Sequence, residues 1–206
     1  MRKFLFIFLL AVSPGFWWIL FQPISVVSEL QKSPVYIEKK INSLFDDERV
    51  VRIGRLRWAH VEESEFKIFL SRAFYNKLMI FVDEFFSFTS FLSPRIYFQA
   101  GDGSGFSPPG IEPIPIILFP FWIYGILRLI KERRYRAIYL LLLFGFGAFL
   151  FGQRKLTYLW PVLLVNIYFA KEGLAAISKS RTRTFLILGI FVYSLYIGGR
   201  ALWLSI

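Results

Sequence analysis

The sequence predicts an all-α integral membrane protein with about five transmembrane helices and an extracytoplasmic segment that carries interfacial amphipathic helices. Of its 206 residues, 56% are apolar and 20% are aromatic, and the mean hydropathy is +0.53. These values exclude a disordered or collagen-like chain and disfavour an ordinary soluble domain. The chain has no Cys, which excludes a disulfide framework and a thiolate metal site.

The distribution of charge supports the same class. The formal net charge is +11, which in a soluble protein would suggest nucleic acid as a partner. Residues 22–112, however, hold 11 basic against 12 acidic residues, a net of −1, while the rest of the chain holds 14 basic against 2 acidic residues, a net of +12. The excess therefore lies beside the apolar segments, as it does when Lys and Arg accumulate in cytoplasmic loops. The expected partner is the lipid bilayer, with no nucleic acid.

The first apolar segment covers residues 4–21 and follows two basic residues. We expect it to be a transmembrane helix, so that residues 1–21 form one unit. The alternative is a cleaved secretory signal peptide, which has the same charged start. The helix is favoured because Pro14 directly follows the Ala-x-Ser-like site at residues 11–13, and the apolar run continues beyond that site.

Four further apolar segments predict a four-helix transmembrane module over residues 113–206, and they cover residues 113–130, 137–151, 156–170 and 185–204. A helix that crosses a hydrocarbon core of roughly 30 Å needs about 20 residues. The shorter segments should therefore use flanking residues, with basic side chains that reach toward the head groups. These side chains are Arg128, Arg136, Lys155 and Lys171.

The basic clusters predict the orientation. If all five spans are real, the clusters at residues 2–3, 131–136 and 171–183 fall on the same face of the membrane. That face should be cytoplasmic, so we expect the N-terminus inside. Residues 22–112, the turn at residues 152–155 and the C-terminus are then outside. The expected location is the plasma membrane of a prokaryote.

Residues 22–112 are too long for a simple connection, so we expect them to form a small layer on the membrane. Ser33 before Pro34 predicts an N-cap and a first helical position, opening a helix that runs to about residue 45. A second helix is expected from about residue 64 to residue 91, where apolar residues recur at steps of three and four. Such a helix would lie in the membrane interface or pack on other helices as core, and the two are compatible.

After Pro94 the sequence changes character. Residues 96–98 predict an extended stretch, and the glycines at residues 101–105 predict turns. A glycine-rich run can also cradle a phosphate, but such a loop needs a strand before it and a helix with Lys after it. The sequence has neither pattern here, so we interpret this stretch as a structural turn.

Two stretches together resemble a known family. The first consists of Arg72-Ala-Phe-Tyr-Asn-Lys77, Phe91-Leu-Ser-Pro94, Tyr97-Phe98 and Gly101-Asp102-Gly103. The second stands at the outer start of a late helix and consists of Arg154-Lys155, Tyr158 and Pro161. In this order they resemble the C-terminal part of the GT-C-type membrane glycosyltransferases, of the dolichyl-phosphate-mannose protein mannosyltransferase and aminoarabinose transferase superfamily. The second stretch departs from the family's Arg-Tyr-x-x-Pro pattern, because two residues separate the basic pair from the tyrosine.

The resemblance implies transfer of a sugar from a polyprenyl-phosphate carrier to an acceptor on the extracytoplasmic side. The family's catalytic acid lies in the first extracytoplasmic loop of a much longer chain, and this sequence resembles only the end of such a chain. The run Asp46-Asp47-Glu48 is superficially similar to the acidic motif of that loop, but it lies well after the first span, so we interpret it as a solvated helix end.

The function implied for this chain is therefore carrier-lipid binding by a module that lacks the catalytic loop. A separate subunit that carries the catalytic loop would then be a partner. The alternative is a non-catalytic membrane scaffold, or partner subunit, with a glycosyltransferase-like fold. The sequence leaves open whether the chain is an enzyme.

The candidate lipid-phosphate-binding residues are cations of the outer side and one tyrosine beside them: Arg72, Lys77, Arg154, Lys155 and Tyr158. Cations held by a short turn at the outer surface, against the insertion bias, would attract a phosphate strongly. Their structural partners would instead be acids of the long segment, such as Asp83, Glu84 or Asp102. Asp102 is also a loop candidate, because the glycines around it let backbone approach a ligand, and its structural role would be an Asx-type turn.

No cofactor is evident from the sequence. No cluster of His, Asp and Glu has the spacing of metal ligands, and a divalent cation, which relatives of the family use, would need a missing N-terminal half to complete its site. The one histidine, His60, stands in a polar stretch beside Glu62 and Glu63, and we expect it to be solvated.

Overall fold

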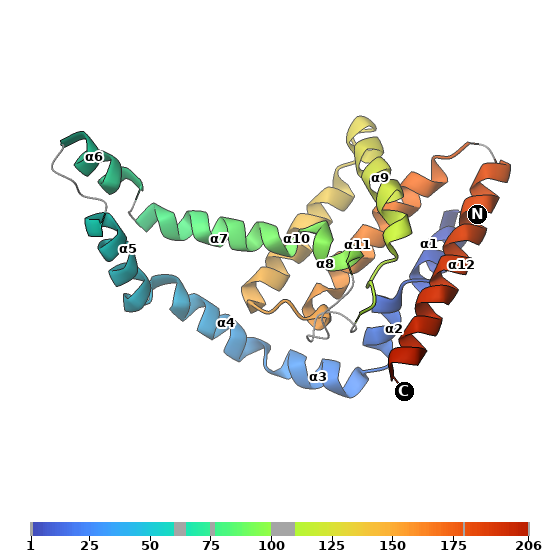
Figure 1. The fold of residues 1–206 in the computed structure, drawn as a ribbon, viewed down its shortest axis with the longest axis horizontal. Helices are drawn as coiled ribbons and strands as arrows, with labels where there is room; N and C mark the ends of the chain where they lie inside the picture. Colours follow the sequence, from blue (N-terminus) through green and yellow to red (C-terminus); the bar gives the residue numbers. More distant parts are fainter. Residues whose placement is uncertain (1, 60–64, 75–76, 100–109, 179, 206) are drawn as a thin grey trace.

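The computed structural model describes residues 2–59, 65–74, 77–99, 110–178 and 180–205. Within these residues every regular element is a helix, which confirms the all-α class. In chain order, with η for a 3-10 helix, they are α1 (Arg2–Ala11), α2 (Pro14–Leu20), α3 (Pro23–Gln31), α4 (Ser33–Asn42), η1 (Ser43–Phe45), α5 (Asp47–Ala59), α6 (Glu65–Phe74), α7 (Lys77–Phe91), α8 (Pro94–Phe98), η2 (Ile116–Leu118), α9 (Phe119–Lys131), α10 (Arg136–Phe151), α11 (Leu156–Ala175) and α12 (Ser180–Ser205). Figure 1 shows a bundle, made by α1, α2 and α9 to α12, and a long arm, made by α3 to α7.

Helix α11 is the centre of the bundle. Helices α1, α2, α9 and α10 all pack on it, and most of its side chains are buried, among them Leu159, Val162 and Ile167. The sequence explains this position, because residues 156–170 are apolar at nearly every step and leave no face that favours water.

The closest approach within the bundle is the crossing of α9 and α11. A Cβ atom added to Gly125 would collide with the Phe169 backbone and would lie 3.0 Å from the Gly173 nitrogen. Beside the crossing, the indole N–H of Trp122 donates to the side-chain oxygen of the buried Asn166 at 2.7 Å. Gly125 and Gly173 have no side chains, and this lets the two backbones touch, as in helix pairs that pack within lipid. The hydrogen bond from Trp122 satisfies the buried amide beside the crossing.

The first apolar segment is two helices and not the single helix that we predicted. Helix α1 ends before Pro14, which has no N–H to continue it and instead opens α2. Two side chains satisfy carbonyl groups that the break leaves open. Ser13 Oγ donates to the Leu9 carbonyl at 2.7 Å, and the indole N–H of Trp17 donates to the Ala11 carbonyl at 2.6 Å.

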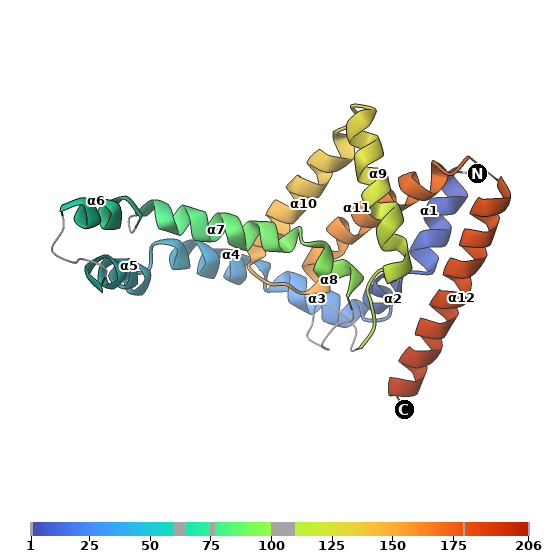
Figure 2. The same cartoon turned by 45° about the horizontal axis from the view of Figure 1, so that its top comes forward.

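The arm is held together by ion pairs between its helices. Glu84 of α7 binds Lys40 of α4 at 2.5 Å and Arg49 of α5 at 2.7 Å. The Lys40 ammonium also lies 4.6 Å from the ring centroid of Phe149, in α10. Helices α4 and α7 both pack on α10, and Figure 2 shows the arm leaving the bundle from the C-terminal part of that helix.

The helices of segment 22–112 differ in part from those predicted. Helix α4 begins at Ser33, so this residue is not the N-cap, and its hydroxyl donates to the Leu30 carbonyl at 2.6 Å. Of the predicted helix over residues 64–91, the structure describes α6 and α7, and residues 75 and 76 between them lie outside the described residues. Residues 96–98 are not extended and belong to α8, because Pro94 is suited to the first position of a helix. Helices α3 and α5 were not predicted.

The ends of the bundle helices fall into two groups. Figure 1 shows the N-terminus, the α9–α10 connection and the start of α12 at one end, which we call the basic end because residues 131–136, Arg181 and Arg183 belong to it. The C-terminus, the α10–α11 turn and α3 lie at the other end, which we call the turn end.

One helix among the described residues is long and apolar enough to cross a membrane by itself. It is the stretch Arg181–Arg200 of α12, with 11% of its apolar window buried in the protein. Residues Ile116–Lys131 and Arg136–Phe151 meet the same criteria only as a pair, and they are bent against each other by 119°. Length and hydropathy alone therefore identify one candidate span, or two if the bent pair is one span.

Candidate functional site

The turn between α10 and α11 places two cations at the turn end of the bundle. Gly152 ends α10 with a φ of +62°, in the left-handed region that glycine adopts without strain. Lys155 stands at the N-cap position of α11, but its side chain does not cap the helix. The side chains of Arg154 and Lys155 instead reach across to the arm.

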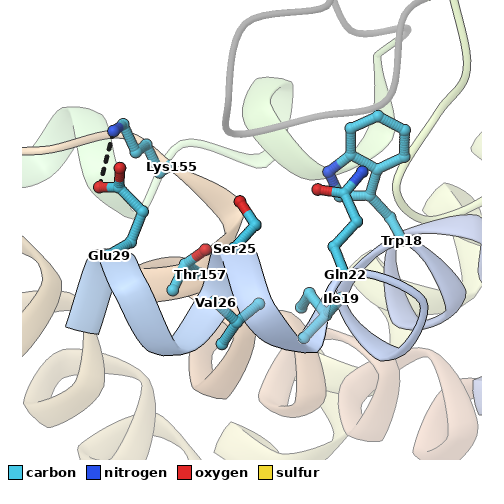
Figure 3. Close-up of a pocket in the computed structure, with 8 residues that line it drawn as sticks. All are labelled: Trp18, Ile19, Gln22, Ser25, Val26, Glu29, Lys155 and Thr157. Carbon is cyan, nitrogen blue, oxygen red and sulfur yellow. Dashed lines mark hydrogen bonds and ion pairs between the residues drawn. The ribbon is translucent and has the colours of Figure 1, made fainter. Parts of the chain in front are cut away.

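Lys155 binds a carboxylate of α3, as Figure 3 shows. Its Nζ lies 2.7 Å from Glu29 Oε2, and the two side chains are 29% and 16% exposed. Tyr158 OH donates to the backbone carbonyl of Glu29 at 2.5 Å. The hydrogen bond from Lys155 lowers the pKa of Glu29, and the same bond raises the pKa of Lys155. Both groups are therefore charged at neutral pH.

Arg154 is held by uncharged groups. Its Nη2 donates to Ser90 Oγ at 2.7 Å, and its guanidinium carbon lies 5.7 Å from the ring centroid of Phe91. Both partners belong to the C-terminal turn of α7. Among the residues that the structure describes, no carboxylate forms an ion pair with Arg154.

A pocket opens beside the Lys155–Glu29 pair. Its volume is about 100 Å³, and it is lined by Trp18, Ile19, Gln22, Ser25, Val26, Glu29, Lys155 and Thr157. Figure 3 shows Trp18 and Gln22 at one end of the pocket and the ion pair at the other.

The structure brings together three of the predicted site residues. Arg154, Lys155 and Tyr158 share the turn end of the bundle, whereas Arg72 belongs to α6 and Lys77 begins α7. Figure 1 shows α6 and the start of α7 at the far end of the arm. The loop candidate Asp102 and the histidine His60 lie outside the described residues.

Lys155 pairs with an acid of segment 22–112, as the structural alternative predicts, but the acid is Glu29 and not Asp83 or Glu84. Asp83 pairs with Arg52 at 3.9 Å, and Glu84 has its partners within the arm, while Lys155 pairs with Glu29. Pro23 at the first position of α3 was a signal for the helix that carries Glu29, but no local pattern links residue 29 to residue 155. The acidic run at residues 46–48 is exposed and enters the first turn of α5, where carboxylates favour the helix N-terminus.

A second ionic cluster lies at the basic end. The carboxylate of Glu172, which is 2% exposed, lies 2.5 Å from Lys171 Nζ and 3.5 Å from Arg134 Nη1. Arg128 donates to the backbone carbonyl of Glu172 at 3.3 Å. These contacts tie α9 and the α9–α10 connection to α11, so we interpret the cluster as structural. In the described part of the chain, no group of three or more His, Cys, Asp or Glu residues could hold a metal ion.

We expect the Lys155–Glu29 pair to stabilise the fold by about 1 kcal/mol. Lys155→Met and Glu29→Gln should each lower the free energy of unfolding by about that amount, and the double variant should lower it by clearly less than the sum. Lys32→Met is the matched control, because Lys32 binds the same carboxylate at 3.1 Å but is 56% exposed. Its effect should stay below about 0.5 kcal/mol. Unfolding in detergent measures all four variants, and strictly additive effects would contradict the pairing.

The same pair predicts how stability depends on pH. Because the pKa of Glu29 is lowered, its contribution is present above its ordinary value of 4.5 and is lost as the pH falls through the folded value. Because the pKa of Lys155 is raised, its contribution is present below its ordinary value of 10.5 and is lost as the pH rises through the folded value. Glu29→Gln should therefore reduce the loss of stability on acidification below pH 4.5.

Comparisons with models of protein families, with curated proteins and with solved structures found no match for this chain. The resemblance to the GT-C-type glycosyltransferases therefore stays a prediction. We therefore infer the function from the residues of this chain, and above all from Arg154 and Lys155 in the turn between α10 and α11.

Proposed function

We propose that this chain is an integral membrane module with five spans whose outer turn binds the phosphate of a polyprenyl-phosphate sugar carrier. The spans are the α1–α2 pair and α9 to α12, with the N-terminus in the cytoplasm and residues 22–112 outside. In this role the module contributes carrier binding to a glycosyltransferase, and a separate subunit supplies the catalytic acid. The sugar acceptor would lie on the outer side.

The surface of the bundle supports the membrane placement. Helix α12 exposes large apolar side chains on several sides, namely Phe185, Leu188, Phe191, Val192, Leu195 and Tyr196. Each large apolar side chain gains about 1.5–3 kcal/mol when it leaves water for an apolar medium, so lipid suits this surface better than water. The gathering of the basic residues at one end of the bundle fits the bias toward positive cytoplasmic loops.

The surroundings of the Arg154 side chain are the observation that carries the binding proposal. Its guanidinium rests on a hydroxyl and an aromatic ring, at the end of the bundle where α10 and α11 would leave the membrane. A guanidinium presents donors that match the oxygens of a phosphate. Lys155 lies next to it beside the pocket, and its pairing with Glu29 fixes the position of the turn.

We expect Arg154→Gln to weaken the binding of polyprenyl phosphate by about ten- to a hundredfold, because a hydrogen bond to a charged group is worth about 1.5–3 kcal/mol. The matched control is Arg95→Gln on α8, since Arg95 is also exposed and donates to the Gln99 side chain at 2.8 Å. The affinity of the Arg95→Gln variant for polyprenyl phosphate should stay unchanged. Binding is measured in detergent with polyprenyl phosphate and with the phosphate-free polyprenol.

Two results would overturn the binding proposal. One is an affinity for polyprenyl phosphate that Arg154→Gln leaves unchanged. The other is equal affinity of the unaltered protein for the phosphate-free polyprenol. Either result would favour the alternative, a membrane scaffold in which the turn only joins the bundle to the arm.

A further inference from the structure

Helix α7 buries one of its carboxylates, Glu84, and exposes several large apolar side chains. Glu84 is 8% exposed and is held by Lys40 and Arg49 of the arm. The opposite side of the helix presents apolar residues at steps of three and four, each at least half exposed, and we call them the α7 stripe: Leu78, Phe81, Val82, Phe85 and Phe86. A surface helix of a protein in water shows the reverse arrangement.

The α7 stripe continues onto the bundle. Phe88, at the edge of the stripe, packs edge to face on two rings of α10, with centroid distances of 6.1 Å to Phe146 and 5.9 Å to Phe149. Phe146 is itself exposed, on the same side of α10 as the exposed residues Tyr139, Leu142 and Leu143. An apolar surface therefore runs from one of the proposed spans onto the arm.

The direction of the stripe follows from the position of α7 in the arm. Figures 1 and 2 both show α7 on the side of α4 and α5 that is nearer to the α9–α10 connection. The carboxylate of Glu84 points toward α4 and α5, because Lys40 and Arg49 bind it. The stripe lies on the opposite side of α7, so it faces away from α4 and α5 and toward the depth that α10 occupies. This is the level of the hydrocarbon in the membrane placement proposed above.

We propose that α7 lies in the outer leaflet of the bilayer, with the α7 stripe in the hydrocarbon and with α4 and α5 covering its charged side from the water. Lipid suits this surface because the stripe offers only apolar groups and continues a surface that lipid would already cover. The inference rests on the proposed membrane placement and goes beyond it, because five spans can equally carry an arm that stands in water.

Spin labels test this inference on the full chain, which has no Cys of its own. Val82→Cys and Phe85→Cys place labels on the stripe, Asn42→Cys places one on the exposed end of α4, and Val192→Cys places one on the exposed side of α12. The protein is reconstituted into vesicles of phosphatidylethanolamine and phosphatidylglycerol. Collisions of each label are measured with oxygen, which concentrates in hydrocarbon, and with a water-soluble nickel chelate.

The stripe labels should collide severalfold more with oxygen than with the chelate, as the α12 label should, and the α4 label should show the reverse. Chelate access at residues 82 and 85 with oxygen access at residue 192 would overturn the inference and leave the membrane placement standing. Chelate access at all four positions would overturn both. Low access of both reagents to the stripe would mean that protein covers it, and this too would overturn the inference.

Discussion

Gly173→Ala should lower the free energy of unfolding by about 3 kcal/mol, at the upper end of the usual cost of overpacking. The added Cβ would collide with the backbone carbonyl of Phe121 in α9 and would lie 3.0 Å from the Gly125 nitrogen. A backbone carbonyl cannot rotate aside as a side chain can, so α9 and α11 would have to separate. The separation would loosen the helix on which α1, α2 and α10 also pack.

Two other glycines provide the control for this variant. A Cβ at Gly147 in α10, or at Gly189 in α12, meets nothing within 4 Å. Alanine in these helix interiors should stabilise the protein by about 0.5–1 kcal/mol. Thermal unfolding in detergent, followed by circular dichroism, distinguishes the two effects by their sign. If Gly173→Ala proved as harmless as Gly147→Ala, α9 and α11 would not be in backbone contact.

Parts of the bundle could be predicted from the sequence almost to the residue. The apolar helix predicted at residues 137–151 matches α10 (Arg136–Phe151), and the helix predicted from residue 156 starts where α11 starts, at Leu156. A long apolar run and a glycine after its end mark these boundaries locally. Helix α12 is longer than predicted because polar residues at its start continue the helix.

The arm could not be predicted to the same degree, because its contacts are not local. Helix α5 has six charged residues among its 13 and is held through the ion pair of Arg49 with Glu84. The Lys155–Glu29 pair joins residues 126 positions apart. The crossing at Gly125 and Gly173 needs one glycine from each of two helices that do not follow each other in the chain. No periodicity in a single sequence records such pairs.

The candidate site also contains residues that lie together in the sequence and one residue that only the fold brings to them. Arg154, Lys155 and Tyr158 stay together in the structure because they share one turn and the helix start after it. Arg72 and Lys77 were grouped with them through the family resemblance, and the structure separates them by the length of the arm. Glu29 joins the site only through the fold.

Cysteine accessibility tests the proposed orientation most directly, because the outcome at each position is nearly all or none. The chain has no Cys, so Asn42→Cys on α4, Gln153→Cys in the turn and Ser178→Cys after α11 each supply a single thiol. The basic residues should hold Ser178 in the cytoplasm and leave the arm and the turn outside. An impermeant maleimide should therefore label Asn42→Cys and Gln153→Cys in intact cells and Ser178→Cys only after permeabilisation. Equal labelling of all three in intact cells, or labelling of Ser178→Cys alone, would contradict the orientation and with it the outer binding turn.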